Sequence, residues 1–428
     1  MGQLTKIKLL KYKNNGDSFS IVVSGFQSID VVNDFIALLE HCRKLHISTI
    51  VLDFSNYTDK IFPNVIVPFK GIMDYFSGQF GFVFNVVNLT FTNLLKTGFP
   101  KSLNIFKDSE SLTKDIFHRI VEFKTTEEIH SILESVFTQL QKRFTFPPGV
   151  LAATNWGLSE VMDNVIQHAS ASSGYVMLQI TQKSKTLNMT VFDNGQGIYN
   201  SLKGAPEYAH QLRTHLEAIE LSLHQNVTRN PKIGKGYGLW GLTRIIDENG
   251  GFLCLSSGSG SVSRQNGLNT VRNRNLFISD ECLTTKVDIG IIYNTYLDMH
   301  KVFGDYETYE YVNRNVEKYE DEQSEFIVFP LAKESGFRTR TDGEIVRNKI
   351  INFYNISGKP VKIDFTGITE KVTSSFVDEV IAKLYDAYGF DVFHSRFRIV
   401  GNDDYLNILI KQTIDTRTVS NISKLLTT

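Results

Sequence analysis

Three polar side chains near the middle of the chain recur at the spacing of one helix face. Glu160, Asn164 and His168 lie four residues apart, and residues four apart share a face of an α-helix. A carboxylate there can orient or deprotonate an attacking group, and an amide oxygen suits a hard cation such as Mg²⁺ that phosphates and water also hold. An ordinary solvated helix face gives the same pattern.

A second group of candidates follows a strand pattern. Apolar residues alternate with polar ones over residues 187–191, and Asp193 and two glycines, Gly195 and Gly197, come directly after. A carboxylate at a strand end can accept a hydrogen bond from the exocyclic amine of adenine, while the glycines allow a backbone approach that a Cβ would block. An ordinary Asp-Asn-Gly turn explains the same residues.

The third group is a glycine-rich run that opens a helical pattern. It consists of Gly234, Lys235, Gly236, Tyr237, Gly238 and Leu239. Glycines before a helix leave amides free to point at phosphates, the helix dipole adds partial positive charge, and Lys235 would add a full charge. A dinucleotide-binding loop is disfavoured because no strand leads into the run, and a P-loop because no Gly-Lys-Ser or Gly-Lys-Thr ends it.

Taken in order, the three groups resemble the motif boxes of the GHKL superfamily, the ATPase type shared by gyrase, a heat-shock chaperone, histidine kinases and MutL. Residues 160–164 match the helix box, residues 193–197 the adenine box and residues 234–239 the phosphate box. The resemblance covers roughly residues 125–296. It implies an α/β sandwich, in which helices cover one face of a mixed sheet and ATP lies between the two layers.

The resemblance also implies roles for single residues. Glu160 would activate water or a phosphoacceptor, Asn164 would bind Mg²⁺, and Asp193 would recognise adenine. His168 stands where relatives often have histidine, and either a phosphate contact or helix packing would explain it. The Gly-Thr step of a late strand is not evident, and Gly290 is the nearest candidate.

Two further elements must hold these groups in place. Thr125 and Glu128 have the spacing of a capping box, which predicts that a helix begins there. The segment between Gly197 and Gly234 is long, and a helical pattern within it predicts a mobile cover over the site. That pattern consists of Leu212, Leu216, Ile219 and Leu223.

Both ends of the chain carry copies of one internal repeat. Residues 51–60 align without a gap to residues 362–371, and each copy continues into a helix, a strand and another helix. Alternating strands and helices imply a parallel or mixed sheet with helices packed on it. Each copy is therefore expected to form a small β-α-β-α unit.

The repeats resemble STAS and STAS-like domains, which serve as regulatory partners of GHKL kinases. The second copy, residues 361–411, is the better match. In one branch of that family a serine at this strand-to-helix junction is phosphorylated by the partner kinase, which makes Ser374 a candidate phosphoacceptor. A helix-capping role explains Ser374 equally. The first copy has Pro63 and Asn64 near the corresponding place and cannot be modified in the same way.

The predicted fold class is therefore α/β, or α+β, with a central GHKL-type sandwich between two small STAS-like units. We expect a STAS-like domain over residues 1–105 and a GHKL ATP-binding domain over residues 118–298. A connecting segment over residues 299–325 and a second STAS-like domain over residues 326–428 would follow.

Composition limits the partners and the compartment. The chain has 45 Lys and Arg against 46 Asp and Glu, so nucleic acid is not indicated as a partner. Cys42, Cys254 and Cys282 have no metal-ligand spacing and fit a reducing compartment. The most apolar stretch falls far short of the ~20 residues that cross a bilayer, and no cleavable signal opens the chain. We expect a cytoplasmic protein without a membrane segment.

Two classes of function fit these features. In the first, ATP and Mg²⁺ drive a conformational switch, and slow hydrolysis through Glu160 resets it; a protein partner or self-association, for instance a homodimer, would read the switch. In the second, the chain is a serine/threonine kinase of the anti-sigma type whose acceptor is a STAS-like domain in cis or in trans. A histidine kinase is disfavoured because no two-helix pattern with a phosphoacceptor histidine precedes Glu160.

Overall fold

The computed structural model describes residues 9–58, 61–104, 115–228, 238–273, 278–280, 282–304 and 325–427. They belong to two compact units. The first combines Met1–Val136 with Gly157–Tyr293, and the second combines Phe137–Trp156 with Asn294–Thr428. Helices α4 (Thr126–Arg143) and α5 (Val150–His168) each pass from one unit into the other.

The first unit contains a four-stranded sheet near the start of the chain. Its order is β1 (Lys11–Asn14), β2 (Ser18–Val22), β3 (Thr49–Asp53) and β4 (Val83–Val87), together with α1 (Asp30–Lys44), α2 (Pro63–Phe80) and α3 (Thr92–Lys96). Strands β2, β3 and β4 run parallel, and β1 is antiparallel to β2. A proline in the first turn begins α2, and Gly81, with φ +69°, ends it.

A larger, eight-stranded sheet forms the centre of this unit. Its order is β11 (Leu268–Asn273), β10 (Gly260–Gln265), β9 (Phe252–Ser257), β12 (Thr285–Ile292), β8 (Thr186–Asp193), β7 (Gly174–Thr181), β6 (Val121–Phe123) and β5 (Leu103–Asn104). The pair β5–β6 is parallel and the others are antiparallel, so the sheet is mixed as expected.

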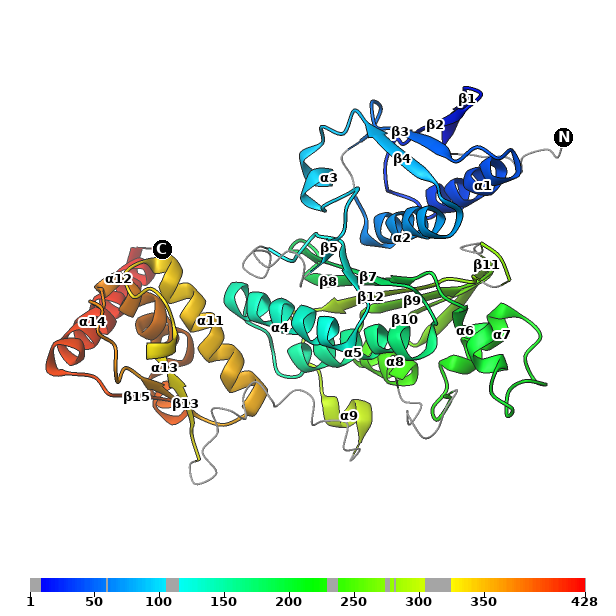
Figure 1. Ribbon diagram of the computed structural model, residues 1–428. Helices are drawn as coiled ribbons and strands as arrows, with labels where there is room; N and C mark the ends of the chain where they lie inside the picture. Colours follow the sequence, from blue (N-terminus) through cyan, green and yellow to red (C-terminus); the bar gives the residue numbers. More distant parts are fainter. Residues whose placement is uncertain are drawn as a thin grey trace. The chain divides into compact units, whose positions relative to one another are not determined.

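Helices cover both faces of the central sheet, whereas the family resemblance implied helices on one face only. Figure 1 shows α5 and α8 (Gly238–Asn249) on one face and α2 on the other. A Cβ added to Gly71 of α2 would lie 2.5 Å from the Phe192 ring, and the Tyr175 hydroxyl donates to Asp74 of α2 at 2.8 Å. Helix α2 covers the large side chains on the second face, among them Tyr175 and Phe192. Because α2 also packs against its own four-stranded sheet, it is buried around most of its circumference.

The second unit contains a parallel sheet of three strands. Its order is β13 (Ile327–Pro330), β14 (Val361–Asp364) and β15 (Phe397–Val400), with helices α11 (Arg340–Ser357), α12 (Ser374–Val377), α13 (Lys383–Arg396) and α14 (Asp404–Thr427). A capping box of Thr339 and Asp342 begins α11, and Gly358, with φ +67°, ends it.

The short helix α9 (Met299–Phe303) lies within the predicted connecting segment and belongs to the same unit. Residues 305–324 of that segment lie outside the described residues.

The two repeat copies have the same local structure. Asp53 ends β3 and Asp364 ends β14, and each carboxylate accepts the amide two residues on, from Ser55 and Thr366, at 2.9 Å. In both copies the next strand continues the parallel pairing, β4 beside β3 and β15 beside β14. The order of elements predicted for both ends of the chain is therefore observed.

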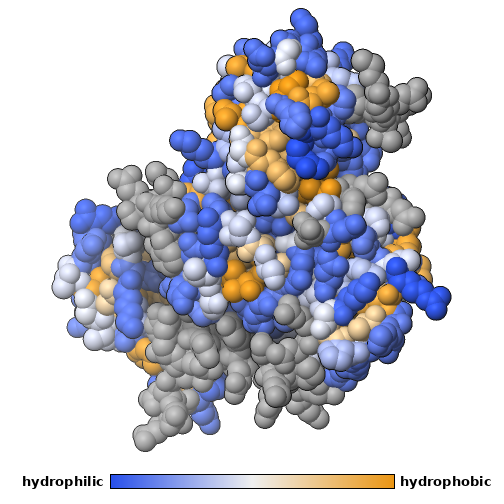
Figure 2. All heavy atoms as spheres, turned by 45° about the vertical axis from the view of Figure 1, so that its right-hand side comes forward, coloured by the Kyte–Doolittle hydropathy of each residue, from blue (hydrophilic) through white to orange (hydrophobic). Residues whose placement is uncertain are grey.

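The face drawn in Figure 2 is mainly hydrophilic, with hydrophobic residues in small separate groups. Large apolar side chains are exposed on the edge strand β4, at Val83 and Val87, and on β11, at Leu268 and Val271. Among the helices that the structure describes, none is both long enough and apolar enough to cross a membrane.

Candidate functional site

Helix α5 carries the first group of candidates on one side, as its spacing predicts. Glu160, Asn164 and His168 are all half-buried. Burial, with a smaller contribution from the nearby Asp163 carboxylate, raises the pKa of Glu160 to about 7. A carboxyl group with that pKa can exchange a proton near neutral pH, which is the property of a general base.

Asp193 lies at the end of β8 and is only 4% exposed. Burial raises the pKa of Asp193 to about 7, against hydrogen bonds from the Gly195 amide, at 2.9 Å, and the Thr285 side chain that lower it. No ion pair to Asp193 is found among the described residues. A buried carboxyl group held only by neutral donors is suited to recognise a donor of a ligand.

The glycines after Asp193 bring its loop against protein neighbours. A Cβ on Gly195 would overlap the Ala169 carbonyl at the end of α5, and the Gln196 amide donates to that same carbonyl at 2.8 Å. Gly197 has φ +73°, and a Cβ there would lie 2.5 Å from Leu283. Both positions need glycine because the loop lies directly against α5 and the residues before β12.

The third group meets the first at the start of α8. A Cβ on Gly238 would lie 2.7 Å from Glu160 Oε2 and 3.7 Å from Asn164 Nδ2. The two helices are also close further along, since a Cβ on Gly157 would lie 2.8 Å from Leu242. Leu239 follows Gly238 in the first turn of α8 and is half-buried. Gly234, Lys235, Gly236 and Tyr237 lie outside the described residues.

Helix α5 thus joins all three groups. Its last residues contact the Asp193 loop, where the Gln196 side chain donates to the His168 carbonyl at 2.6 Å. Glu160 lies eight residues earlier, about 12 Å along the helix axis at ~1.5 Å per residue, beside the start of α8. An elongated ligand could contact both ends of this stretch.

Two residues of the site were missed by sequence reasoning. Thr285 is paired with Asp193 in the register of β12 and β8, and the Thr284 amide donates to the Gly195 carbonyl at 3.2 Å. Gly290, the candidate for the late-strand step, lies at the other end of β12 against the Phe252 ring. The strand pairing, which the sequence does not reveal, is the signal that identifies Thr285.

The segment expected to cover the site is helical where the structure describes it. Helices α6 (Gly197–Lys203) and α7 (His215–Ser222) form there, and α7 begins with a capping box of Thr214 and Glu217. Apolar side chains of this segment pack into a small cluster of their own: Leu202, Ala205, Tyr208, Leu212 and Ala218. Residues 229–237 lie outside the described residues, and a mobile cover stays a prediction.

Ser374 is the first residue of α12 and is exposed. The helix is capped by Thr373, whose hydroxyl accepts from the Phe376 amide at 3.3 Å. Capping therefore does not account for Ser374.

Two of the three cysteines are buried. Desolvation raises the pKa of Cys42 to about 12 and that of Cys282 to about 11, so both thiols stay neutral and unreactive. The Cys282 thiol donates to the Asn194 carbonyl at 3.2 Å, next to Asp193.

Two segments of the chain match known families. Residues 124–249 match the histidine kinase-like ATPase domain, and residues 342–407 match a STAS-like domain of unknown function. The resemblance to a GHKL ATPase with a STAS-like region is therefore confirmed for these segments. The first match supports nucleotide binding of the ATPase or kinase type by residues 124–249.

The chain is also similar to the 43K ATPase domain of Thermus thermophilus gyrase B, solved in complex with an aminocoumarin. The two are 18% identical with a TM-score of 0.21, and the match covers 41% of each chain. Comparison with curated proteins finds no match.

Proposed function

We propose that the chain binds ATP with Mg²⁺ along α5 and acts as a nucleotide-driven conformational switch. The observation that carries this proposal is the convergence of the three groups on one helix. The Asp193 loop contacts the end of α5, and Gly238 lies against Asn164, one turn earlier, and Glu160, two turns earlier. Adenine would bind at the first place and the phosphates at the second.

The adenine end depends on Asp193. Its carboxylate would accept the exocyclic amine of adenine, and the Gly195 amide and Thr285 hold its orientation. The buried surroundings make this bond selective, because a ligand without the donor would keep water from Asp193 and offer no hydrogen bond in its place. His168, whose carbonyl is tied to the Asp193 loop, lies at this end, which favours the packing role over a phosphate contact.

The phosphate end depends on α8 and Asn164. A helix amino terminus attracts anions through free amides and its dipole, and Gly238 keeps the start of α8 free of a side chain. The described residues contain no cluster of three or more His, Cys, Asp and Glu. A Mg²⁺ ion at this end would be held by phosphates, water and Asn164, and it would neutralise phosphate charge.

Glu160 would act as the general base. Its pKa of about 7 leaves a large fraction ionised at neutral pH, and its carboxylate lies beside the helix start where the terminal phosphate would bind. Deprotonating a water molecule there gives hydrolysis, and deprotonating a hydroxyl gives phosphotransfer.

A serine/threonine kinase is the second candidate function. The exposure of Ser374, together with its place outside the Thr373 cap, favours it, because a phosphoacceptor must be accessible. The STAS-like region would be the acceptor in cis or in trans.

Incubation of the purified chain with γ-labelled ATP and Mg²⁺ tests the proposal. We expect free labelled phosphate and no label on protein if the chain is an ATPase switch. Label retained by the parent and lost in Ser374→Ala would favour the kinase. If the parent formed neither free labelled phosphate nor labelled protein, both functions would be contradicted. Light scattering with and without nucleotide would show whether the switch is read by self-association.

A further inference from the structure

Three asparagines form one face of α11. Asn348, Asn352 and Asn355 are spaced at intervals of four and three residues, which places their side chains on the same side of the helix. Asn348 is 4% exposed and Asn352 is fully buried. Buried amides are retained in a core only where their hydrogen bonds are satisfied, so this face must have polar partners.

The partners are the end of α4 and the connection that leads to α5. Asn348 donates to the Lys142 carbonyl at 3.1 Å, and Asn355 donates to the Phe146 carbonyl at 2.7 Å. Asn352 donates to the Gln141 and Phe144 carbonyls, at 3.3 and 2.8 Å, and accepts the Phe146 amide at 2.9 Å. The last carbonyls of a helix have no hydrogen-bond donors within that helix. Here the asparagine side chains provide the donors.

The connection and the start of α5 are also held by α9 and the residues before it. The Leu297 amide donates to the Pro148 carbonyl at 3.2 Å, and Gly149, with φ +83°, lies so close that a Cβ would overlap the Leu297 carbonyl. The Phe303 ring packs on Trp156 of α5 at a centroid distance of 4.8 Å. All of these residues belong to the second unit.

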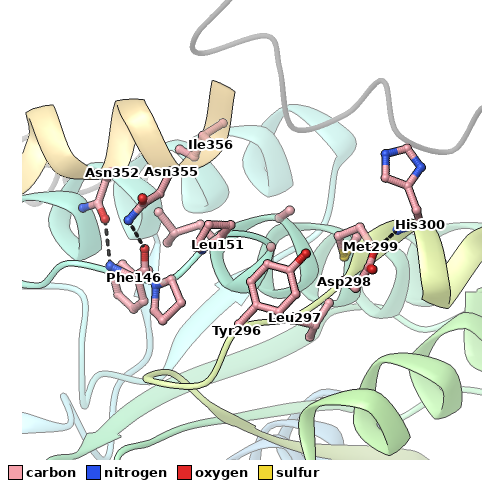
Figure 3. A pocket seen from close by; sticks show the side chains of 14 residues that line it. Phe146, Leu151, Tyr296, Leu297, Asp298, Met299, His300, Asn352, Asn355 and Ile356 are labelled. Carbon is pink, nitrogen blue, oxygen red and sulfur yellow. Dashed lines mark hydrogen bonds between the residues drawn. The ribbon is translucent and has the colours of Figure 1, made fainter. Parts of the chain in front are cut away.

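A cavity of about 80 Å³ lies at this junction (Figure 3). Its lining includes Leu151, Tyr296, Met299 and Ile356, and Asn352 and Asn355 border it. The cavity is partly open to solvent, so packing around the first turn of α5 is incomplete on this side. The directional bonds of the asparagine face go to residues 141–146, and they hold the connection that leads into this turn.

From this arrangement we propose that the asparagine face of α11 is a regulatory contact that positions Glu160. Helix α5 begins at Val150, directly after the connection, and Trp156 and Glu160 are one turn apart along it. A shift of the first turn is therefore carried along a continuous helix to Glu160. Asn352 is a positioning residue, and a partner that displaces α11 would change turnover more than nucleotide affinity. This inference rests on the proposed function.

Variants of the full-length chain test it. Asn352→Leu removes all bonds from this side chain, Asn352→Asp keeps only the acceptor, and Asn355→Ala removes a single bond. Asn407→Ala, at an exposed position of α14, is the control. Hydrogen exchange over residues 141–156 without nucleotide reports on the contact itself, while ATP affinity and turnover report on the site.

We expect faster exchange over residues 141–156 in Asn352→Leu, a turnover ~10- to 100-fold lower from a displaced base, and a much smaller change in ATP affinity. Asn352→Asp and Asn355→Ala should show the same changes to a lesser degree, and Asn407→Ala none. If Asn352→Leu does not fold, Asn355→Ala must still show faster exchange together with reduced turnover.

Suppose that the parent binds and hydrolyses ATP. Faster exchange with unchanged turnover in the asparagine variants would then overturn the inference and leave the proposed function intact. A parent that neither binds nor turns over ATP would overturn both.

Discussion

Glu160 and Asp193 are carboxyl groups that burial holds near a pKa of about 7, and the proposed chemistry uses each in its ionised form. Glu160 must be ionised to accept a proton, and Asp193 must be ionised to accept the adenine amine most strongly. The residue types and the spacing along α5 could be read from the sequence. Burial could not be, because it depends on helices and strands distant in the chain.

Turnover at saturating ATP should rise as pH increases through about 7 and level off above it, because only ionised Glu160 acts as a base. Glu160→Gln should retain ATP binding, lose ~100- to 10,000-fold in turnover, and lose this pH dependence. Glu220→Gln, at an exposed position of α7, is the control. Parent-like turnover in Glu160→Gln would mean that Glu160 is not the base.

The same raised pKa makes a prediction for stability. Between the ordinary carboxyl pKa of 4.5 and about 7, the unfolded chain releases the Glu160 proton and the folded chain keeps it, so the free energy of unfolding falls as pH rises. Glu160→Gln cannot ionise, so the variant does not lose this part of its free energy of unfolding as pH rises. Thermal unfolding should show the variant more stable than the parent at pH 8, with the difference shrinking at pH 5; equal stability at both pH values would argue that Glu160 is solvated.

At the scale of elements, sequence patterns identified α5, β8 and the helix after the glycine run, and the order of elements in both repeat copies. Which of these elements pack or pair with one another could not be read from the sequence. The sequence of α2 is apolar on nearly every side, which indicates burial, but nothing in it names the second face of the central sheet as the surface that it covers. Thr285 was missed for the same reason, since its place beside Asp193 follows from strand register.

The start of α8 offers a test of how closely the two helices must approach. Gly238→Ala places a Cβ 2.7 Å from Glu160 Oε2 and must displace that carboxylate, so turnover should fall. Gly238 is the first residue of α8, where alanine gains less than the ~1 kcal/mol that it gains over glycine inside a helix, so thermal stability should change little.

Gly78→Ala is the matched control, because it introduces the same change inside α2 where a Cβ meets nothing within 4 Å. Full turnover in Gly238→Ala would show that Glu160 has room to move aside.

At the scale of the whole molecule, the two ends of the chain are attached differently. The first repeat copy shares one hydrophobic cluster with the central sheet through α2, so removing it would expose Tyr175 and Phe192. The second copy has a core of its own and holds the α4–α5 connection through polar side chains. Removing the second copy therefore disturbs the remaining core less than removing the first. The boundaries proposed for both copies stay predictions.

Deletion of residues 326–428 should leave a folded core that still binds ATP but with altered affinity or turnover. The deletion leaves the Gln141, Lys142 and Phe144 carbonyls without the asparagine donors, and an effect of ATP on this contact requires an equal effect of the contact on ATP affinity. Calorimetry, phosphate release and light scattering would measure the change. A truncated chain that matched the full chain in all three would make the STAS-like region an independent adaptor.

Calorimetric titration of ATP with Mg²⁺ into the parent and into Asp193→Asn tests the central claim most directly. The amide places a donor against the adenine amine in a buried site, a loss of ~1–3 kcal/mol or more. Asp391→Asn, an exposed change on α13, is the control. We predict that the parent and the control bind alike and that Asp193→Asn shows no measurable binding. Undiminished affinity in Asp193→Asn would contradict the assignment of this site.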